Sequence, residues 1–342
     1  MKSEKLVEIF RGGLMESYHF GHVAICDNKG NLKSYWGNPD EVIYPRSACK
    51  MIQALPLVES GSADYYRLDS KHLALACASH SGGKVHLEIA KDWLKKIDFE
   101  IEDLLCGPHK PDDINELEFL TRKGLKPTQL HNNCSGKHLG FLTVSRNIQE
   151  KSEKKLNYID INHPVQNMVK KIFEEMTNFK NPNFALDGCS APNFTCSVRA
   201  LARSMANLSR PEAFGDRRKI AIERLKTAVI KNPDLIAGDD RLCTKLMRKS
   251  AGRFIVKVGA EGVYTAILLE QGLGLAIKIT DGSKRAAECL IVTILVRLGL
   301  LDQTDKEIKN LLNKPIINWA KNATGVLKPS DTIWEGGKAL KI

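Results

Sequence analysis

Three consecutive apolar segments near the C-terminus constrain the fold more than any other feature of this 342-residue chain. The segments "RFIVKVG" (residues 253–259), "GVYTAILLE" (262–270) and "LGLAIKIT" (273–280) have the length and β-branched content of strands. The short turn "EQG" between the last two predicts a hairpin. Strands are also predicted at the other end, in residues 6–10 and 19–27, so both ends of the chain should contribute to the sheet.

The stretch between these strands is mostly helical by its pattern. In residues 83–98, apolar side chains recur every four positions with lysines and acids between them, as in an amphipathic helix. Further helices are predicted at residues 47–61, with a break at Pro56, and at 114–123, 163–176, 197–208, 211–231, 241–250 and 285–300. We therefore predict an α+β fold, with a mixed sheet covered by helices in α-β-α layers. We expect a single domain over residues 1–342, with a helical lobe at about 64–182.

Cysteine usage and hydropathy indicate the compartment. The nine cysteines are scattered and several lie in apolar runs such as "LALACAS", which is typical of reduced, buried thiols and not of a disulfide framework. The N-terminus has no apolar signal core, and no apolar run approaches membrane-spanning length. We expect a cytoplasmic protein with no membrane contact.

The net charge of +11 comes from 51 Lys+Arg against 40 Asp+Glu. The basic concentrations are short and mixed with acids, as in "QEKSEKKLN" (149–157) and "RPEAFGDRRK" (210–219), and no nucleic-acid-binding motif accompanies them. A lysine-rich surface without a nucleic-acid partner is the favoured interpretation. No Walker, GxGxxG, HExxH, EF-hand or GxSxG pattern occurs either.

Ser47 and Lys50 in "YPRSACKMIQ" form the first candidate for catalysis. Side chains three residues apart share a helix face, and the start of a helix favours negative charge such as a developing alkoxide. A desolvated lysine can act as the general base for a serine nucleophile. The alternative is an N-capping serine beside a surface lysine, which the spacing alone favours, although the apolar context after Lys50 indicates burial.

Two further candidates lie in a loop and in two strands. Ser79 and His80 end the run "LALACASHSGG", where a second serine could relay a proton or orient a substrate; an ordinary polar loop is the equal alternative. Lys257 in "VKVGAEG" and Lys278 in "AIKITDG" are isolated charges in strands, which are costly to bury unless they are paired. Both could also be outward-facing surface lysines.

A fourth candidate is the polar stretch "QLHNNCSGKHLGF", which contains Cys134 and Lys137, together with the loop "LDGCSAPNF", which contains Asp187 and Cys189. Thiolates from separate loops suit zinc. A cysteine near a helix start could instead be a nucleophile of lowered pKa, or the stretch could be a buried cysteine in a polar loop. The spacing leaves these three interpretations open.

Taken together, these stretches resemble the class 3, rhizobial-type bacterial L-asparaginases of the asparaginase II family. The similar segments are "RGGLMESYHFG", "YPRSACKMIQALPLVESG", "LALACASHSG", "HNNCSGKHLGFL", "LDGCSAPNF", "VKVGAEGVY" and "GLAIKITDGSKRA". They occur in order over about residues 8–300. The resemblance implies a homodimer with a fold similar to serine β-lactamases, penicillin-binding proteins and glutaminases. It implies hydrolysis of the L-asparagine side-chain amide to L-aspartate and ammonia, by acyl transfer beside a zinc site.

The resemblance also implies roles for individual residues. The catalytic set would be two Ser-Lys tandems, made by Ser47 with Lys50 and by Ser79 with Lys257, where Lys278 is a rival for the last position. The zinc ligands would be Cys134, Lys137 and Cys189, and the substrate pocket would be lined by Arg46, His80 and Asp187. The alternatives are a glutaminase or another serine acyl-transfer enzyme on the same scaffold, and a zinc-binding protein without turnover.

Overall fold

The computed structural model describes residues 2–148 and 157–337, so the basic segment at 149–157 lies, except for its last residue, outside the described part. The chain divides into two compact units. Unit 1 comprises Met1–Ala48, Cys196–Arg210 and Lys249–Ile342, and unit 2 comprises Cys49–Thr195 and Pro211–Arg248. The helical lobe expected at about 64–182 falls inside unit 2, and the single-domain organisation stays a prediction.

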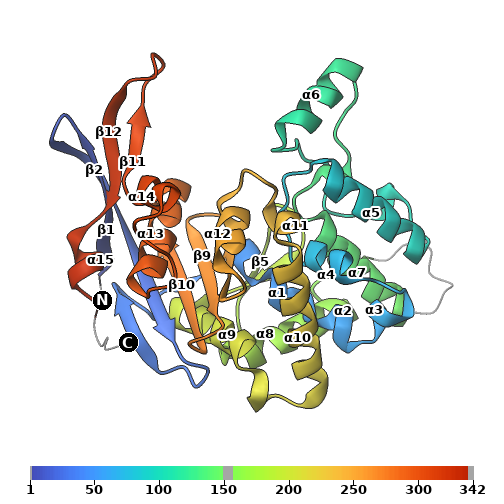
Figure 1. Cartoon of the computed structure of the whole chain (residues 1–342). Coiled ribbons are helices and arrows are strands. Elements are labelled where there is room, and N and C mark those ends of the chain that lie inside the picture. Colours follow the sequence, from blue (N-terminus) through green and yellow to red (C-terminus); the bar gives the residue numbers. More distant parts are fainter. Residues whose placement is uncertain (1, 149–156, 338–342) are drawn as a thin grey trace. The chain divides into compact units, whose positions relative to one another are not determined.

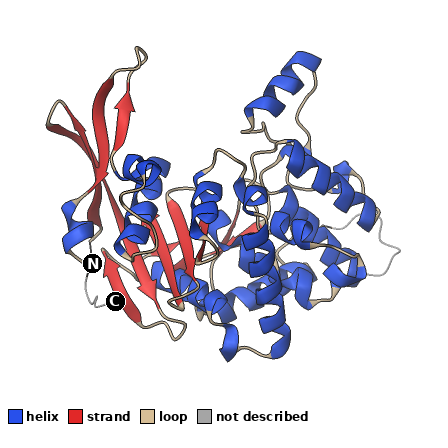
Figure 2. Cartoon of the chain, viewed as in Figure 1, coloured by secondary structure: helices blue, strands red, loops and turns tan. Residues whose placement is uncertain are grey.

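Unit 1 is built around an eight-stranded sheet (Figures 1 and 2). The strand order is β11-β12-β1-β2-β10-β9-β8, and β3 also pairs with β2. The sheet strands are β1 (Glu4–Arg11), β2 (Leu14–Cys26), β3 (Leu32–Trp36), β8 (Phe254–Val258), β9 (Val263–Leu268), β10 (Leu273–Ile279), β11 (Lys314–Ile317) and β12 (Ala323–Pro329). A separate pair is formed by β4 (Val42–Ile43) and β7 (Cys196–Ser197).

The α+β class is confirmed, with one correction to the sheet. We expected a mixed sheet, but every pairing among the described strands is antiparallel. The reason is the connections: β1 and β2, β8 and β9, and β9 and β10 are joined by short turns, and such turns can only reverse the chain. The hairpin predicted at the "EQG" turn is the β9–β10 pair.

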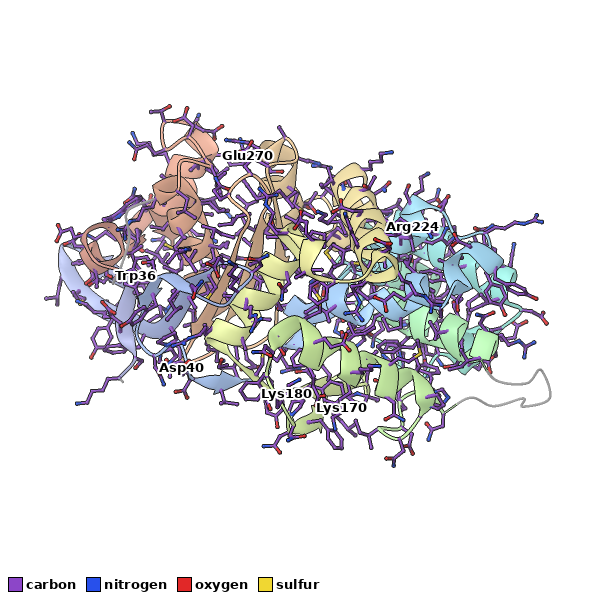
Figure 3. The ribbon with its side chains drawn as sticks, turned by 90° about the horizontal axis from the view of Figure 1, so that it is seen from below. Trp36, Asp40, Lys170, Lys180, Arg224 and Glu270 are labelled. Carbon is purple, nitrogen blue, oxygen red and sulfur yellow. The ribbon has the colours of Figure 1, made fainter. Side chains whose placement is uncertain are left out.

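Helices cover both faces of the unit 1 sheet. All six residues of β9 are buried, which requires cover on each side. The helix α9 (Val198–Ser209) packs on β2, β9 and β10, and α13 (Lys284–Arg297) packs on β1, β9, β10 and β12. The remaining helices of the unit are α14 (Lys306–Leu312) and α15 (Asp331–Glu335). Buried Trp36 (Figure 3) ties the end of β3 to α15, because its indole Nε1 donates to the Thr332 carbonyl at 3.0 Å.

Unit 2 is mainly helical. Its helices are α1 (Lys50–Gln53), α2 (Leu55–Glu59), α3 (Ser62–Tyr65), α4 (Ser70–Ala76), α5 (Lys84–Ile97), α6 (Ile114–Lys123), α7 (Ser135–Ile148), α8 (Pro164–Thr177), α10 (Asp216–Lys231), α11 (Pro233–Ala237) and α12 (Leu242–Ser250), the last of which runs into unit 1. Its one described hairpin pairs β5 (Phe184–Leu186) with β6 (Pro192–Phe194). The expected break at Pro56 is confirmed, since this residue lies in the first turn of the separate helix α2.

All nine cysteines lie in the described residues, and all are buried and free, as their placement in apolar runs predicted. Among the described residues, no helix is both long and apolar enough to cross a membrane.

Helix α7 depends on a glycine in its first turn. A Cβ on Gly136 would lie 2.1 Å from the backbone oxygen of Leu75 in α4, which is far inside van der Waals contact. We expect Gly136→Ala to lower the free energy of unfolding by about 1–3 kcal/mol, the usual cost of overpacking, in a urea titration followed by circular dichroism. Gly140→Ala is the matched control, because its Cβ would meet only side chains at 3.8 and 3.9 Å. Equal stability of the two variants would contradict this packing.

Candidate active site

Ser47 lies in a tight turn at the point where the two units join along the chain. A 3-10 helix spans Arg46–Cys49 and continues directly into α1, which begins at Lys50. The turn is closed by the Ala48 backbone N–H, which donates to the Pro45 carbonyl at 3.1 Å. Ser47 therefore lies at the start of a helical stretch, as the sequence predicted, and is partly exposed.

Lys50 is held inside unit 2 by three oxygen atoms. Its side chain is only 1% exposed. The ammonium Nζ donates to the Ala78 carbonyl at 2.5 Å, to the Ser79 hydroxyl at 3.0 Å and to the Asn133 carbonyl at 3.2 Å. No carboxylate appears among these partners. A hydroxyl can donate as well as accept, so the contact with Ser79 can persist whether Lys50 carries its third proton or not.

The Ser79–His80 segment is fixed by backbone and side-chain bonds. The Ser79 N–H donates to the Ile236 carbonyl at 2.9 Å, and His80 is fully buried. His80 Nδ1 accepts from the Gly82 N–H at 3.1 Å, which leaves the proton on Nε2, and Nε2 lies 2.8 Å from the Ser135 hydroxyl. Burial holds the pKa of His80 well below its usual range, so the ring is neutral. Both ring nitrogens therefore serve to position this loop.

The predicted zinc ligands lie together in unit 2. Lys137, in the first turn of α7, donates from Nζ to the Cys189 sulfur at 3.0 Å. Cys134, the residue before α7, is hydrogen-bonded to Cys189, and its sulfur also lies 3.1 Å from Asn133 Oδ1. All three side chains are buried. Two cysteines 55 positions apart in the sequence thus meet at one lysine.

The three groups shift one another's protonation. The hydrogen bond from Cys134 is the main cause that holds the pKa of Cys189 far below its usual range, and Lys137 adds to it. The same bond raises the pKa of Cys134. Burial disfavours the charged form of Lys137, but the charges of the two sulfurs and of Asp187 outweigh burial and raise its pKa. The cluster is therefore a thiolate beside an ammonium and a thiol.

The chemistry of this donor set fits zinc. Thiolate sulfur is a preferred zinc ligand, and a site with three protein ligands leaves a fourth position open. Among the described residues, no group of three or more His, Cys, Asp or Glu side chains could hold a metal. The Lys137 nitrogen lies 3.0 Å from the Cys189 sulfur, and it could act as a further ligand after losing a proton.

Asp187 lies in a turn next to this cluster. Its N–H donates to the Ala191 carbonyl at 2.9 Å, and its carbonyl accepts from the Ser190 N–H at 2.8 Å. The carboxylate is half-buried, accepts from the Gly188 N–H and contributes to the raised pKa of Lys137. It can thus present a negative charge close to Lys137.

The two rival lysines both lie in unit 1, in different strands. Lys257, in β8, is 8% exposed, and its Nζ donates to the Val258 carbonyl at 2.9 Å. Lys278, in β10, is half-buried and donates to the Glu261 carbonyl. Burial lowers the pKa of Lys278, and the charge of Arg46 adds to the effect. Both are therefore strand lysines satisfied by backbone oxygen atoms.

Sequence reasoning missed two residues of the site. Asn133 supplies a carbonyl to Lys50 and a side-chain oxygen to Cys134, and the Ser135 hydroxyl contacts His80. Both belong to the polar stretch around Cys134, so their position was the available signal. Their roles left no other trace, because a backbone carbonyl looks the same for every residue type.

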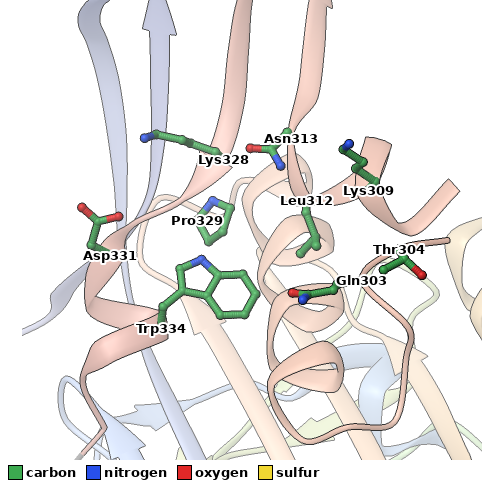
Figure 4. Close-up of a pocket in the computed structure, with 9 residues that line it drawn as sticks. All are labelled: Gln303, Thr304, Lys309, Leu312, Asn313, Lys328, Pro329, Asp331 and Trp334. Carbon is green, nitrogen blue, oxygen red and sulfur yellow. The ribbon is translucent and has the colours of Figure 1, made fainter. Parts of the chain in front are cut away.

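A separate pocket of about 480 Å³ lies in unit 1 among α14, β12 and α15 (Figure 4). Leu312, Pro329 and Trp334 form its apolar part, and Lys309 and Lys328 lie at its edges. None of the predicted site residues lines it. Its size alone gives no reason to place chemistry there.

The comparison with protein families agrees with the sequence resemblance. The family model described as L-asparaginase II matches residues 7–329. No curated protein gives a match. Among solved structures, a β-lactamase from Mycobacterium bovis is 12% identical with a TM-score of 0.40, over 78% of this chain and 89% of the other. A β-lactamase candidate from Bacteroides dorei is 11% identical with a TM-score of 0.43, over 76% and 84%. Scores this low carry no argument about the site.

Proposed function

Because the chain belongs to the L-asparaginase II family and is thus a hydrolase acting on amides, we propose that it converts L-asparagine to L-aspartate and ammonia. The observation that carries the mechanism is the position of Lys50. This buried amine lies 3.0 Å from the Ser79 hydroxyl and three residues after Ser47, at the start of a helix. A serine and a buried lysine that is hydrogen-bonded to hydroxyl and carbonyl oxygen atoms are the parts of a Ser-Lys acyl-transfer site.

In the first half of the proposed reaction, Ser47 is the nucleophile. Its Oγ attacks the side-chain carboxamide carbon, and its proton passes to neutral Lys50. The tetrahedral intermediate then collapses, the C–N bond breaks, and Lys50 returns the proton to the departing ammonia. Backbone N–H groups at this helix start are suited to hold the oxyanion, at about 2.7–4 kcal/mol per donor. The product of this half is an aspartyl ester on Ser47.

In the second half, water hydrolyses the ester. Ser79 is the natural group to pass a proton between this water and Lys50, because its hydroxyl already contacts the lysine. Lys257 is proposed as the second lysine, since it is the more buried of the two strand lysines. Water attacks the acyl carbon, the ester bond to Ser47 Oγ breaks, and Ser47 regains its proton as L-aspartate leaves.

Three residues are proposed to bind the substrate. The Asp187 carboxylate is half-buried and can pair with the α-ammonium group. Arg46, directly before Ser47, can hold the α-carboxylate. His80 is proposed to line the same pocket as a positioning residue, because both of its ring nitrogens already bond within unit 2.

We also propose that Cys134, Lys137 and Cys189 bind zinc beside this pocket. Bound zinc would supply fixed positive charge that orients the substrate. The residues themselves contribute a buried thiolate, and a thiol and an ammonium that would each lose a proton to a bound metal; the ammonium nitrogen lies 3.0 Å from the Cys189 sulfur. In this arrangement Asp187 keeps its carboxylate for the substrate ammonium.

The role of Ser79 can be tested separately from that of Ser47. We expect Ser79→Ala to lower kcat for asparagine by about 10²–10⁴-fold, the usual contribution of a proton-transfer group, in an assay of steady-state ammonia release. Ser81→Ala is the matched control, because Ser81 is a buried serine in the same loop whose hydroxyl lies against Gly238. A Ser79→Ala variant as active as Ser81→Ala would remove Ser79 from the mechanism.

The substrate is tested by ammonia release from L-asparagine and L-glutamine, together with turnover of a chromogenic β-lactam. We expect the highest kcat/KM for L-asparagine, the substrate that the family match favours. Asp187 and Arg46 would recognise the α-ammonium and α-carboxylate groups, which separates both amino acids from the β-lactam but not asparagine from glutamine. A preference for glutamine, or turnover of the β-lactam alone, would assign the same scaffold to another acyl-transfer reaction. Zinc binding without turnover of any of these would favour a non-catalytic zinc protein.

Assembly and compartment remain part of the proposal. We propose a homodimer, which light scattering coupled to size-exclusion chromatography would detect as twice the chain mass. The nine free, buried thiols support a reducing compartment such as the cytoplasm.

A further inference from the structure

Unit 1 contains a second polar pocket, of whose lining residues the proposed reaction uses only Arg46. Its volume of about 370 Å³ is that of a small-molecule site, which spans roughly 300–1,000 Å³. The side chains that matter for its chemistry are His22, Glu41, Tyr44, Arg46, Glu261 and Lys278. All of them belong to unit 1, so that unit alone defines the pocket.

Two cations line this pocket. Arg46 precedes the proposed nucleophile, and Lys278 is the strand lysine that the Ser-Lys tandems leave unused. Burial is the main cause that lowers the pKa of Lys278, and the charge of Arg46 adds to it, so the two cations lie within electrostatic reach of each other. Lys278 is anchored through the backbone carbonyl of Glu261. Two cations that line one pocket can both bind the carboxylate group of a ligand.

His22 adds a neutral donor to the same pocket. The side chain is only 6% exposed, and its Nδ1 accepts from the Asn38 backbone N–H at 2.9 Å. An imidazole whose Nδ1 accepts must carry its proton on Nε2. Burial also lowers the pKa of His22, which keeps the ring neutral. The ring therefore has one N–H left to offer to a ligand.

Two acids balance the two cations. Glu41 and Glu261 are exposed residues of the pocket lining. The two carboxylates would repel a ligand that carries only negative charge. A ligand with both charges can place its negative group on Arg46 and Lys278 and its positive group near the two acids.

Backbone conformation gives a second, independent observation. Arg46 and Glu261 are non-glycine residues with φ of 52° and 55°, in the left-handed region. Such residues carry strain that surrounding structure must hold, and they concentrate at ligand sites. The turn at Glu261 is what presents its carbonyl to Lys278.

We propose that this pocket binds a free zwitterionic α-amino acid as a second ligand of the protein. Its carboxylate would lie on Arg46 and Lys278, with the His22 N–H as a further donor, and its ammonium group would face Glu41 and Glu261. The site shares only Arg46 with the proposed substrate pocket. It rests on the proposed function in one respect, the choice of aspartate as the probe.

The test is calorimetric titration of L-aspartate into the full chain carrying Asp187→Ala, which weakens the proposed substrate pocket. We expect binding to remain, and Lys278→Met in this background to weaken it by at least about tenfold, the value of one charge-assisted hydrogen bond. Lys278→Arg should bind within about threefold of the parent, since it keeps the charge. Lys328→Met is the control, because Lys328 is a lysine of the same unit that does not line this pocket; it lies in β12 over the Phe10 ring.

The zwitterion requirement is tested with succinate, which lacks the ammonium group. Glu261→Gln should weaken aspartate binding but not succinate binding. Aspartate binding that Lys278→Met leaves unchanged, or no binding at millimolar concentration, would overturn the inference. The proposed function is tested separately, by ammonia release, so the two proposals can fail independently. If aspartate binding depends on Lys278 but the protein does not hydrolyse asparagine, the second binding site is supported and the proposed reaction is rejected.

Discussion

Replacing Ser47 by alanine should lower kcat for L-asparagine by about 10⁴-fold or more, because removal of a nucleophile leaves only substrate binding and oxyanion stabilisation. Lys50→Met should cause a loss of similar size, since the two residues act as one unit. The double variant should then be no worse than either single variant. Steady-state ammonia release, with a quenched long incubation for the slow variants, measures all three.

Controls separate chemistry from folding in this experiment. Ser60→Ala removes a partly buried hydroxyl of unit 2 that is hydrogen-bonded to the Ser62 hydroxyl and backbone N–H, and it should retain the wild-type rate. Lys50→Met also removes the buried donor of the Ala78 carbonyl and one of two donors of the Asn133 carbonyl, which keeps the His80 N–H, so its thermal stability must be measured beside its activity. A Ser47→Ala variant with more than about a tenth of the wild-type kcat would reject Ser47 as the nucleophile.

Replacing Cys189 by alanine should weaken zinc binding by at least about 100-fold, since loss of a direct ligand exceeds the 10–100-fold typical of residues that only support ligands. Cys134→Ala should act in the same way. Lys137→Met should weaken zinc binding as well, because it removes the nitrogen that lies 3.0 Å from the Cys189 sulfur. Zinc content after dialysis against a chelator of known affinity gives the measurement.

Cys106→Ala is the matched control for the zinc variants. Cys106 is a buried thiol close enough to Cys134 and Cys189 for their charges to raise its pKa, but its sulfur donates to the Gln129 carbonyl at 3.5 Å. It should keep full zinc content. Loss of zinc in Cys106→Ala, or its retention in Lys137→Met, would show that the ligand set is wrong.

The elements with strong periodicity were predictable from sequence. The strands β8 to β10 have continuous apolar runs because both of their faces are covered, and α5 has the stripe of a helix with one buried face. The strands β11 and β12 were not predicted. They carry exposed or half-buried residues at most positions, so no burial pattern marks them in the sequence.

The sequence could name candidate site residues but not their arrangement, and the roles of those residues stay predictions. Spacing singled out Ser47 and Lys50 because residues three apart share one helical turn. Nothing in the sequence predicts the hydrogen bonds from Lys50 to the Ala78 and Asn133 carbonyls. These carbonyls belong to two loops that the packing of α4 against α7 brings together. The pairing of Cys134 with Cys189 likewise needs a fold; from the residues alone it was one of three open interpretations, and the family resemblance implied it.

The central claim is that an aspartyl ester forms on Ser47, and trapping that ester tests it most directly. Ser79→Ala protein mixed with L-asparagine, quenched in acid within one turnover and digested, would be mapped by mass spectrometry. We expect an aspartyl adduct on the peptide that contains Ser47, and no such adduct in Ser47→Ala protein treated in the same way. An adduct on Cys134, or ammonia release by Ser79→Ala protein with no adduct on Ser47 at any quench time, would contradict it.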